Sequence, residues 1–347
     1  MKRGGRSAAV RRLAPFMAAL ALMGFAAPVA ARDLVVMSFN VRYPNPDDGP
    51  DVWEKRQGAT IAAIRKAAPD IMGTQELFQR QGDAIVAALP QYRWFGTDRR
   101  GGHADEHMGV FYRQDRFELV EQGQFWLSDT PEVVGSITWG QPLPRMVTWG
   151  LFAVRRGKDK GRRFYLVNTH FPYREADTAA RTKAAQLVAR WIDARPAPIP
   201  VILTGDFNTG PDSAAHARLT QSLTDTWTAA PGRRGPAPGY HGFAPVPAEA
   251  RIDWVLERGM RVVGVHSPHA RYGGHYPSDH YPMVARLAWP ASPSPASPGA
   301  LAPAGAASAR AARDGRAAPR WRTGQSAAIC AGYLTPPSAS GRDATVP

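Results

Sequence analysis

The chain has 347 residues, a length that suits two average domains or one large domain. Its single cysteine, Cys330, excludes an intrachain disulfide framework and any zinc site built from several cysteines. The formal net charge of +14 would favour a nucleic-acid partner if the charge were gathered on one folded surface.

Residues 1–31 have the three-part layout of a secretory signal peptide. Five positive charges and no acidic residue precede an apolar run from Leu13 to Val29, and small residues suited to cleavage after Ala31 follow it. The run is interrupted by a proline and is too short for an uncleaved anchor helix. We therefore expect a secreted or periplasmic protein without a transmembrane helix after cleavage, exported by the general or, less consistently with its sequence, the twin-arginine route.

Residues 290–347 are dominated by Ala, Pro, Ser and Gly, a composition that predicts a disordered tail. The tail and the signal peptide together carry +9 of the net charge, which leaves +5 for residues 32–289. Within that domain, the segment 154–163 alone carries six positive charges and one negative charge. The rest of the domain is formally neutral, so composition gives no support to a cationic surface that wraps DNA.

The central residues 32–289 alternate short apolar runs with helical patterns, which predicts one α/β or α+β domain. Strands are expected at 34–40, 70–76, 107–113, 117–125, 147–155, 163–170, 199–206, 251–257, 261–266 and 281–289. Helices are expected at 53–67, 78–89 and 178–194, where apolar residues recur with the helical period.

Polar residues stand at the ends of six of these strands. They are Asn40, Glu76, His170, Asp206 with Asn208, Asp253, and the pair Asp279-His280. One such residue is usually a turn former, but six strand ends with oxygen or imidazole groups are poorly explained in that way. Because side chains at strand ends converge at the rim of a sheet, the sequence predicts one polar pocket there.

The residue types in this pocket indicate metal-assisted hydrolysis. Carboxylate and amide oxygens such as those of Glu76 and Asn40 suit Mg²⁺ or Mn²⁺ and not zinc. His280 can take a proton from water if a carboxylate holds its other ring nitrogen, and Asp253 is the candidate. With His170 as a second imidazole, the set describes hydrolysis of a phosphoester.

Six short motifs follow one another along residues 34–287. They are Ser38-Phe39-Asn40-Val41-Arg42, Thr74-Gln75-Glu76, Asn168-Thr169-His170, Gly205-Asp206-Phe207-Asn208, Arg251-Ile252-Asp253 and Ser278-Asp279-His280. In this order they resemble the motif set of the endonuclease/exonuclease/phosphatase superfamily, which includes deoxyribonuclease I. The resemblance implies a four-layer sandwich, in which helices flank two packed mixed β-sheets.

The resemblance also implies roles for the motif residues. The implied metal contacts are Asn40, Glu76 and Asp279. The implied catalytic residues are His170, Asp206, Asn208, Asp253 and His280. Asp206 would orient or deprotonate the attacking water, and Asn208 would position the phosphate. His280 and His170 would neutralise the phosphoryl group, and the identity of the general base stays open.

Other segments resemble a secreted bacterial branch of small phosphodiesterase- and phosphatase-like members. They are Gly49–Glu54, Phe111-Tyr112-Arg113, Leu143-Pro144-Arg145 and His241-Gly242-Phe243. Glu106 and Arg145 match this branch and are expected to face the substrate, together with His241 and His275. Where relatives often carry Asp-His, this chain has Phe171-Pro172-Tyr173, so the resemblance does not transfer a particular substrate.

We therefore expect a monomeric metal-dependent phosphoesterase that acts on a phosphodiester or a phosphomonoester. At about 3.3 Å per residue, the basic turn near Arg163 lies roughly 23 Å from His170 along one strand. This distance favours a small molecule or a lipid headgroup over nucleic acid. The alternatives are an extracellular nuclease, a non-catalytic binding module, and a sphingomyelinase-like membrane enzyme with an exposed aromatic hairpin at Phe125-Trp126 or Trp139.

Several other polar residues have simpler explanations. The spacing from His103 to His107 fits an inverted zinc-protease motif, but the preceding glycines predict a loop instead of the required helix. His216, His266 and His269 belong to no motif and are expected to be structural or surface histidines. Asp225 is expected to form a turn or a helix cap.

Overall fold

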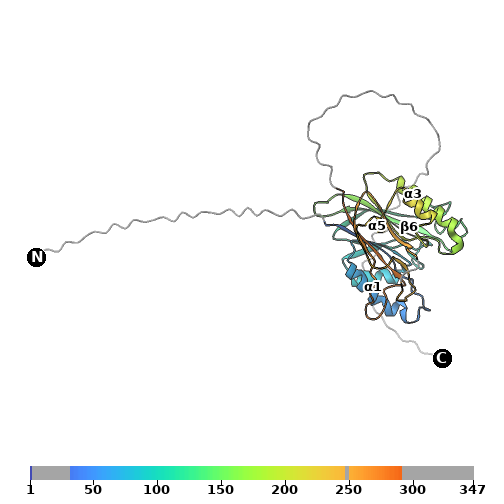
Figure 1. Cartoon of the computed structure of the whole chain (residues 1–347), viewed down its shortest axis with the longest axis horizontal. Coiled ribbons are helices and arrows are strands. Elements are labelled where there is room, and N and C mark those ends of the chain that lie inside the picture. Colours follow the sequence, from blue (N-terminus) through green and yellow to red (C-terminus); the bar gives the residue numbers. More distant parts are fainter. Residues whose placement is uncertain (2–31, 247–249, 291–347) are drawn as a thin grey trace, which may run out of the picture. The chain divides into compact units, whose positions relative to one another are not determined.

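The computed structural model describes residues 1, 32–246 and 250–290 (Figure 1). Residues 32–246 and 250–290 fall within a single compact unit. The predicted signal peptide and tail lie outside the described residues, apart from the first residue of each, Met1 and Pro290. Within the part of the chain that the structure describes, no helix has the length and apolar character needed to cross a membrane.

A seven-stranded mixed sheet has the strand order β10-β13-β15-β1-β2-β4-β3. Its strands are β1 (Leu34–Asn40), β2 (Ile71–Gln75), β3 (Tyr92–Phe95), β4 (Val110–Arg113), β10 (Arg233–Arg234), β13 (Arg261–His266) and β15 (Met283–Ala288). Strand β1 runs parallel to β2 and antiparallel to β15, and it therefore ends beside the end of β2.

A second sheet has six strands in the order β5-β6-β7-β8-β12-β9. They are β5 (Phe117–Trp126), β6 (Met146–Val154), β7 (Arg163–His170), β8 (Val201–Asp206), β9 (Thr224–Asp225) and β12 (Asp253–Arg258). Strands β7 and β8 are parallel, and β12 is antiparallel to β8. A separate two-stranded ribbon pairs β11 (Gly239–Tyr240) with β14 (His280–Tyr281).

The helices cover the outer faces of the two sheets, as Figure 1 shows for α1 and α3. Helices α1 (Trp53–Ala67) and α2 (Gln79–Ala88) share a buried apolar cluster with Met37 and Phe39 of β1. Trp191 of helix α3 (Thr178–Asp193) stacks on Phe125 of the second sheet. The short helices are α4 (Ala214–Leu219), α5 (Thr226–Ala229), η1 (Gly49–Asp51) and η2 (Glu175–Asp177).

The main core lies between the two sheets. Leu34 and Val36 of β1 pack there with Leu166 and Ile202 of the opposite sheet, while the alternate residues of β1 face the helices. Because successive side chains of a strand point to opposite faces, Asn40 shares the inner face with Leu34 and Val36. The predicted four-layer sandwich is thus confirmed, and a polar group stands at the end of the inner face of β1.

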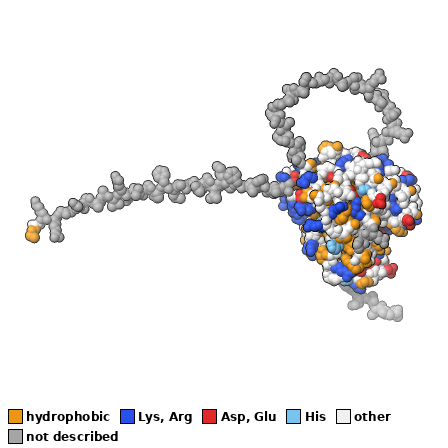
Figure 2. All heavy atoms as spheres, in the orientation of Figure 1, with side chains coloured by type: hydrophobic (Ala, Val, Ile, Leu, Met, Phe, Trp, Pro, Cys, Tyr) orange, Lys and Arg blue, Asp and Glu red, His pale blue; other side chains and the backbone are white. Residues whose placement is uncertain are grey.

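The predicted elements are largely confirmed. The strands at 34–40, 163–170 and 261–266 have the expected bounds, and all three expected helices form. The expected strand at 281–289 is interrupted at Pro282, whose nitrogen has no hydrogen to donate, so that β14 and β15 are separate. The basic turn joins β6 to β7 at the end opposite His170, and Figure 2 shows cationic side chains spread over the visible face.

Candidate active site

Strand register places three of the predicted catalytic residues side by side at one sheet edge. We call His170, Asp206 and Asp253 the catalytic row. His170 ends β7 and lies beside Asp206, which ends the parallel strand β8. Asp253 begins β12 and lies on the other side of Asp206 in the antiparallel register. Each of the three residues is at most 3% exposed. Strand β12, which is distant from β7 in the sequence, therefore contributes to the same sheet edge.

Asn40 joins this row to the end of the other sheet. Its Nδ2 donates to Oε1 of Glu76 and to Oδ2 of Asp206, at 3.0 Å in both cases. Its Oδ1 accepts a hydrogen bond of 2.9 Å from the backbone nitrogen of Arg42, which fixes the orientation of the amide. The backbone nitrogen of Tyr43 donates to Oε2 of Glu76 at 3.1 Å. One amide thus holds two carboxylates from opposite sheets close together.

Three residues around the site have backbones in the left-handed region. The φ angles are 57° at Arg42, 58° at Glu76 and 50° at Asn208, and each residue lies just beyond a strand end. Side chains with a Cβ rarely adopt this conformation, which costs energy and persists where surrounding contacts enforce it. At Asn208, the backbone nitrogen donates to Oδ1 of Asp206 and the side chain donates to the carbonyl of Phe171.

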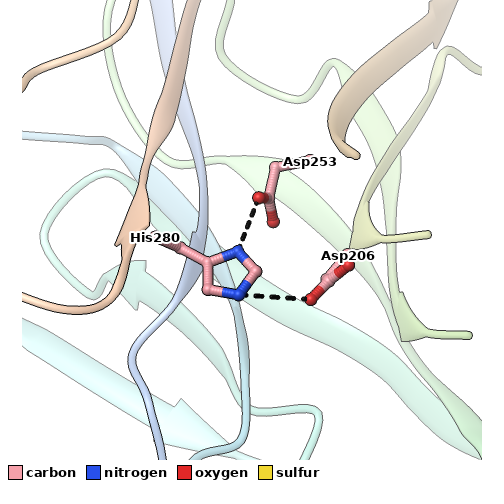
Figure 3. Close-up of side chains that lie close together, drawn as sticks. All are labelled: Asp206, Asp253 and His280. Atoms are coloured by element: carbon pink, nitrogen blue, oxygen red, sulfur yellow. Dashed lines mark hydrogen bonds and ion pairs between the residues drawn. The ribbon is translucent and has the colours of Figure 1, made fainter. Parts of the chain in front are cut away.

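His280 lies between two carboxylates (Figure 3). Its Nδ1 is 2.8 Å from Oδ2 of Asp253, and its Nε2 is 3.8 Å from Oδ2 of Asp206. Burial disfavours a charged ring, but the negative charges of Asp253, Asp206 and Asp279 outweigh it and raise the pKa of His280 to about 10. The predicted contact between His280 and Asp253 is present, and it favours a positively charged imidazole.

Asp206 and His170 differ from His280 in that their surroundings favour the uncharged form. Burial and the negative charge of Asp253 raise the pKa of Asp206 to about 7. Burial and the positive charge of Arg145 lower the pKa of His170 well below its usual range, which keeps that ring neutral. Nε2 of His170 is 3.5 Å from Oδ2 of Asp206. The site therefore combines a cationic histidine, a neutral histidine and a carboxylate with an affinity for protons near neutral pH.

The donor set fits a divalent cation. Burial raises the pKa of Asp253 and Asp279, with further contributions from neighbouring acidic groups, and a cation would relieve this crowding of negative charge. Asp206, Asp253 and His280 offer ligand atoms within 4.8 Å of one another. Nδ1 of His280 is already bonded to Asp253, whereas the carboxylate of Glu76 and Oδ1 of Asn40 offer oxygen ligands of the kind that Mg²⁺ prefers.

Asp279 contacts protein groups that would compete with a metal ion for its carboxylate. Its Oδ2 is 3.4 Å from Nη1 of Arg42, and its Oδ1 accepts a hydrogen bond from Ser278 at 3.2 Å. Arg42 is itself held by Asp48 through Nε and Nη2 at 3.0 and 2.7 Å. The metal contact implied for Asp279 stays a prediction, and the contacts in the structure place it against an arginine.

Glu106 and Arg145 lie near the candidate active site, since Glu106 interacts with the charge of Glu76 and Arg145 with that of His170. Arg99 forms an ion pair with Glu106 at 2.9 Å, and burial together with the negative charge of Glu76 raises the pKa of Glu106 to about 7. Arg145 is 4% exposed, and its Nη1 has no hydrogen-bond partner among the described residues. Its guanidinium stands 5.8 Å from the ring of Tyr173, which is 53% exposed.

The two remaining predicted substrate residues differ in position. The ring of His241 stacks on Tyr281 at 3.9 Å, and its backbone nitrogen donates to the carbonyl of Asp279, so that it supports the segment carrying His280. Burial lowers the pKa of His241 to about 4. Nδ1 of His275 is 3.4 Å from Asp51 in η1, and its described contacts include none with the catalytic row.

Sequence reasoning gave no role to four supporting residues. They are Arg56 and Arg99, which lie outside the quoted motifs, and Arg42 and Asn168, which lie within them. Arg56 is fully buried and donates to the backbone carbonyls of Val41, Arg42 and Pro277, which ties the loops around the site together. Its position on the buried stripe of α1 was an available signal, because a charged side chain there needs partners.

Two of the simpler explanations are confirmed, those for residues 103–107 and for Asp225. Residues 103–107 form no helix, and Nδ1 of His103 is bonded to Nε2 of His107 at 3.1 Å. Asp225 caps α5 by accepting from the backbone nitrogen of Trp227. The aromatic hairpin suggested at Phe125-Trp126 is wrong, because both side chains are only 2% exposed.

Two facing sheets with a polar centre at their common end define an α/β sandwich with the residue types of a hydrolase. The chain belongs to the Endonuclease/Exonuclease/phosphatase family, whose sequence profile matches residues 37–280. Members of this family are hydrolases that act on phosphoesters and generally use a divalent metal.

Several known proteins are similar to this chain. A family member from Bacteroides vulgatus is 32% identical with a TM-score of 0.69, over 74% of this chain and 99% of that one. A mannosyl-6-phosphatase from Bacteroides thetaiotaomicron VPI-5482 is 32% identical with a TM-score of 0.68, over 74% of this chain and all of that one. Protein angel from Drosophila melanogaster is 21% identical over 169 residues, which span 47% of this chain and 45% of that relative.

Proposed function

We propose that this protein is a divalent-metal-dependent hydrolase of small phosphomonoesters whose alcohol is a sugar or another polyol. The observation that carries the proposal is the position of Asp206 between Asn40, His170 and His280, with Glu76 held opposite. This arrangement provides a carboxylate for a water, positive charge for a phosphate and oxygen ligands for a cation within one cluster of buried side chains.

Asp206 is suited to receive the proton of the attacking water. Its Oδ1 is bonded to the backbone of Asn208, and its Oδ2 receives the amide of Asn40, so that the carboxylate has one orientation. The raised pKa of Asp206 gives it the proton affinity that a general base needs near neutral pH. Asn40 holds the same oxygen that lies closest to both catalytic histidines.

His280 is suited to stabilise negative charge on the phosphoryl group. Asp253 holds its Nδ1, so that Nε2 points toward the pocket with its hydrogen available for donation. His170 adds a second ring at the same edge of the sheet. Donors that are fixed before the reaction stabilise a developing charge without reorganisation. Glu76 and Asn40 would hold the cation, which when bound would neutralise phosphoryl oxygens and acidify a water.

The preference for a polyol is based on the side of the pocket formed by Arg99, Glu106 and Arg145. In this cluster the carboxylate of Glu106 can accept hydrogen bonds from hydroxyl groups, and the guanidinium groups of the arginines can donate to them. Tyr173 and Tyr240 are each 53% exposed, and Tyr240 packs edge-on to His280 at 5.5 Å. Exposed ring faces of this kind suit the apolar face of a sugar. A relative that is 32% identical is a mannosyl-6-phosphatase.

The proposed location is the periplasm or the exterior of the cell. The support for this proposal is the layout of residues 1–31, in which basic residues precede an apolar run and a small-residue cleavage site. Fractionation of cells that express the full chain, with N-terminal sequencing of the product, tests it. A protein beginning at Arg32 outside the cytoplasm is the expected result.

A substrate panel tests the proposed activity. The full chain is assayed with mannose 6-phosphate, bis(p-nitrophenyl) phosphate and plasmid DNA, each in Mg²⁺, in Mn²⁺ and in excess chelator. We expect phosphate release from the sugar phosphate, dependent on the metal. Asp206→Asn should reduce kcat by about 10²–10⁴-fold because it removes the general base.

The matched control is Asp212→Asn, which makes the same change at an exposed position. It should retain full activity. Nicking of DNA at physiological salt with no turnover of sugar phosphates would replace the proposed substrate class with nucleic acid. Equal activity of Asp206→Asn and Asp212→Asn would contradict the role of Asp206.

A further inference from the structure

A second pocket of about 350 Å³ lies outside the catalytic row. It is formed between the last turn of α1, the β10–β13 edge of the seven-stranded sheet and the loop that follows β13. Its polar lining residues are Lys66, Arg234, His266, Ser267, His269 and Tyr272. A volume of this size is within the range of pockets that bind small ligands.

The lining of this pocket is cationic. Lys66 and Arg234 supply two full positive charges, and His266 and His269 supply two imidazoles, whereas no Asp or Glu lines the pocket. Neither Lys66 nor Arg234 has an ion-pair partner among the described residues. Burial and the positive charge of Arg234 lower the pKa of His266, as expected where positive charge is not balanced.

Ser267 gives a second and independent indication of a ligand. Its side chain is 2% exposed, and its hydroxyl has no hydrogen-bond partner within the described part of the chain. A buried hydroxyl without a partner is costly, and this one belongs to a residue that lines the pocket.

The backbone around Ser267 is closely packed. Gly235 has a φ of 91°, and a Cβ there would lie 2.1 Å from the carbonyl oxygen of Ser267. The backbone nitrogen of Ser267 donates to the carbonyl of Arg234 at 2.8 Å. These contacts fix Arg234 and Ser267 beside each other at the end of β10. The pocket is therefore held by backbone contacts at a position where only glycine fits.

The pocket lies near the catalytic site. His266 pairs with Val284 of β15, which pairs with Met37 of β1, three residues before Asn40. Two strand spacings of about 4.8 Å and three residues of about 3.3 Å give a separation of roughly 14 Å. The ring of His269 is 6.4 Å from that of Tyr281, the residue after His280. The pocket and the candidate active site therefore lie at the same end of the sheet, with the pocket on the face that α1 covers.

We propose that this pocket binds a phosphate group. Lys66 and Arg234 donate charge-assisted hydrogen bonds to its oxygens, and the hydroxyl of Ser267 donates a third. The phosphate is either the second phosphate of a substrate whose first phosphate is hydrolysed, or free inorganic phosphate. The first source rests on the proposed function, whereas binding of phosphate itself does not.

Histidine NMR resonances provide a test that needs no catalysis. The full chain is titrated with inorganic phosphate, and the imidazole signals of His266 and His269 are followed separately from those of His170 and His280. We expect saturable shifts of the first pair. Lys66→Glu with Arg234→Glu should weaken this response at least tenfold. Ser267→Ala should weaken it about twofold to tenfold.

The matched control is Arg65→Glu with Arg233→Glu. It makes the same charge change on the same helix turn and the same strand, at exposed residues that do not line the pocket. Its phosphate response should stay within twofold of the wild-type response. Absence of saturable shifts at His266 and His269, or equal weakening in both double variants, would overturn the proposal.

Kinetics then distinguish the two sources of phosphate. A hexose bisphosphate and a hexose monophosphate are compared as substrates of the wild type and of Lys66→Glu with Arg234→Glu. A KM raised only for the bisphosphate identifies a substrate phosphate, and unchanged KM values with lost NMR binding identify free phosphate. If neither compound is hydrolysed, the proposed function fails while the NMR result still decides on the pocket.

Discussion

Asp225 shows how a residue distant from the chemistry can support the site. Its Oδ2 is 2.5 Å from Nη2 of Arg251 and 2.9 Å from Nε2 of His216, and all three side chains are largely buried. Arg251 lies two residues before Asp253, so this cluster anchors the start of β12. The arginine of the Arg251-Ile252-Asp253 motif therefore has a structural contact of its own.

We predict that Asp225→Asn destabilises the protein by about 3 kcal/mol, because the positive charge of Arg251 stays buried without its partner. Burial acts to raise the pKa of Asp225, but the hydrogen bond from His216 and the charge of Arg251 outweigh it and lower that pKa. The stabilisation is thus present above the unfolded-state pKa of about 3.9 and is lost as the pH falls through the lower folded-state value.

Urea unfolding of both proteins at pH 7, 4 and 3 measures this effect. The difference in the free energy of unfolding should be full at pH 7 and should shrink at the two acidic values. A difference that grows on acidification would contradict the assigned direction. Asp193→Asn is a suitable control, because Asp193 pairs with Arg218 at a side chain that is 42% exposed.

The residues that meet at the candidate site could be predicted from sequence, whereas the contacts of several residues that support them could not. Asn40, Asp206 and His280 stand at strand ends within recognisable strings. Arg99 and Asn168 act through contacts with distant segments, such as the hydrogen bond of 2.7 Å between Asn168 and Gln75. Local patterns contain no information on such contacts, because they depend on how the two sheets are packed.

At the scale of the elements, a buried polar network joins the two sheets beneath the site. Asn168 of β7 donates to the carbonyl of Thr74 in β2 at 2.7 Å and accepts from Thr204 of β8 at 3.0 Å. Gly73 faces this network, and a Cβ there would lie 2.1 Å from Oγ1 of Thr204 and 2.5 Å from Oδ1 of Asn168. The absence of a side chain at Gly73 therefore leaves the space that the network occupies.

We predict that Gly73→Ala destabilises the protein by about 1–3 kcal/mol, since the added methyl group forces the packed sheets apart. Gly58→Ala is the matched control. Gly58 lies on the exposed side of α1 with no heavy atom near the added methyl group, and the change should stabilise by about 0.5–1 kcal/mol. Opposite signs in urea unfolding are expected. Stabilisation by Gly73→Ala would show that the network adapts to the methyl group.

Long periodic elements were predictable, and short ones were not. Helices α1 and α3 have apolar stripes over several turns, and their predicted bounds differ from the observed ones by at most one residue. Strands such as β10 and β11 contain two residues each, so no period can develop in them. Their pairing is a consequence of the surrounding fold.

At the scale of the whole molecule, most of the net positive charge lies outside the folded domain. Of the net charge of +14, residues 32–289 carry +5, and the basic turn between β6 and β7 accounts for that excess. Strand β7 runs from Arg163 to His170, so the turn lies at the opposite end of the sheet from the catalytic row. Two arginines near the site are paired with carboxylates, Arg99 with Glu106 and Arg42 with Asp48, whereas Arg145 has no ion-pair partner among the described residues.

We therefore predict that hydrolysis of a small phosphomonoester depends weakly on ionic strength. A protein that follows a DNA backbone through six to ten phosphate contacts loses about 10³–10⁵ in affinity between 50 and 200 mM salt. The balanced site should lose less than about tenfold in kcat/KM over that range, because buried pairs are poorly screened. Steady-state kinetics at constant Mg²⁺ measure this slope, with plasmid DNA as the comparison substrate. A slope as steep as that of a DNA-binding protein would mean that a cationic surface extends to the catalytic row. Nucleic acid would then be favoured as the substrate.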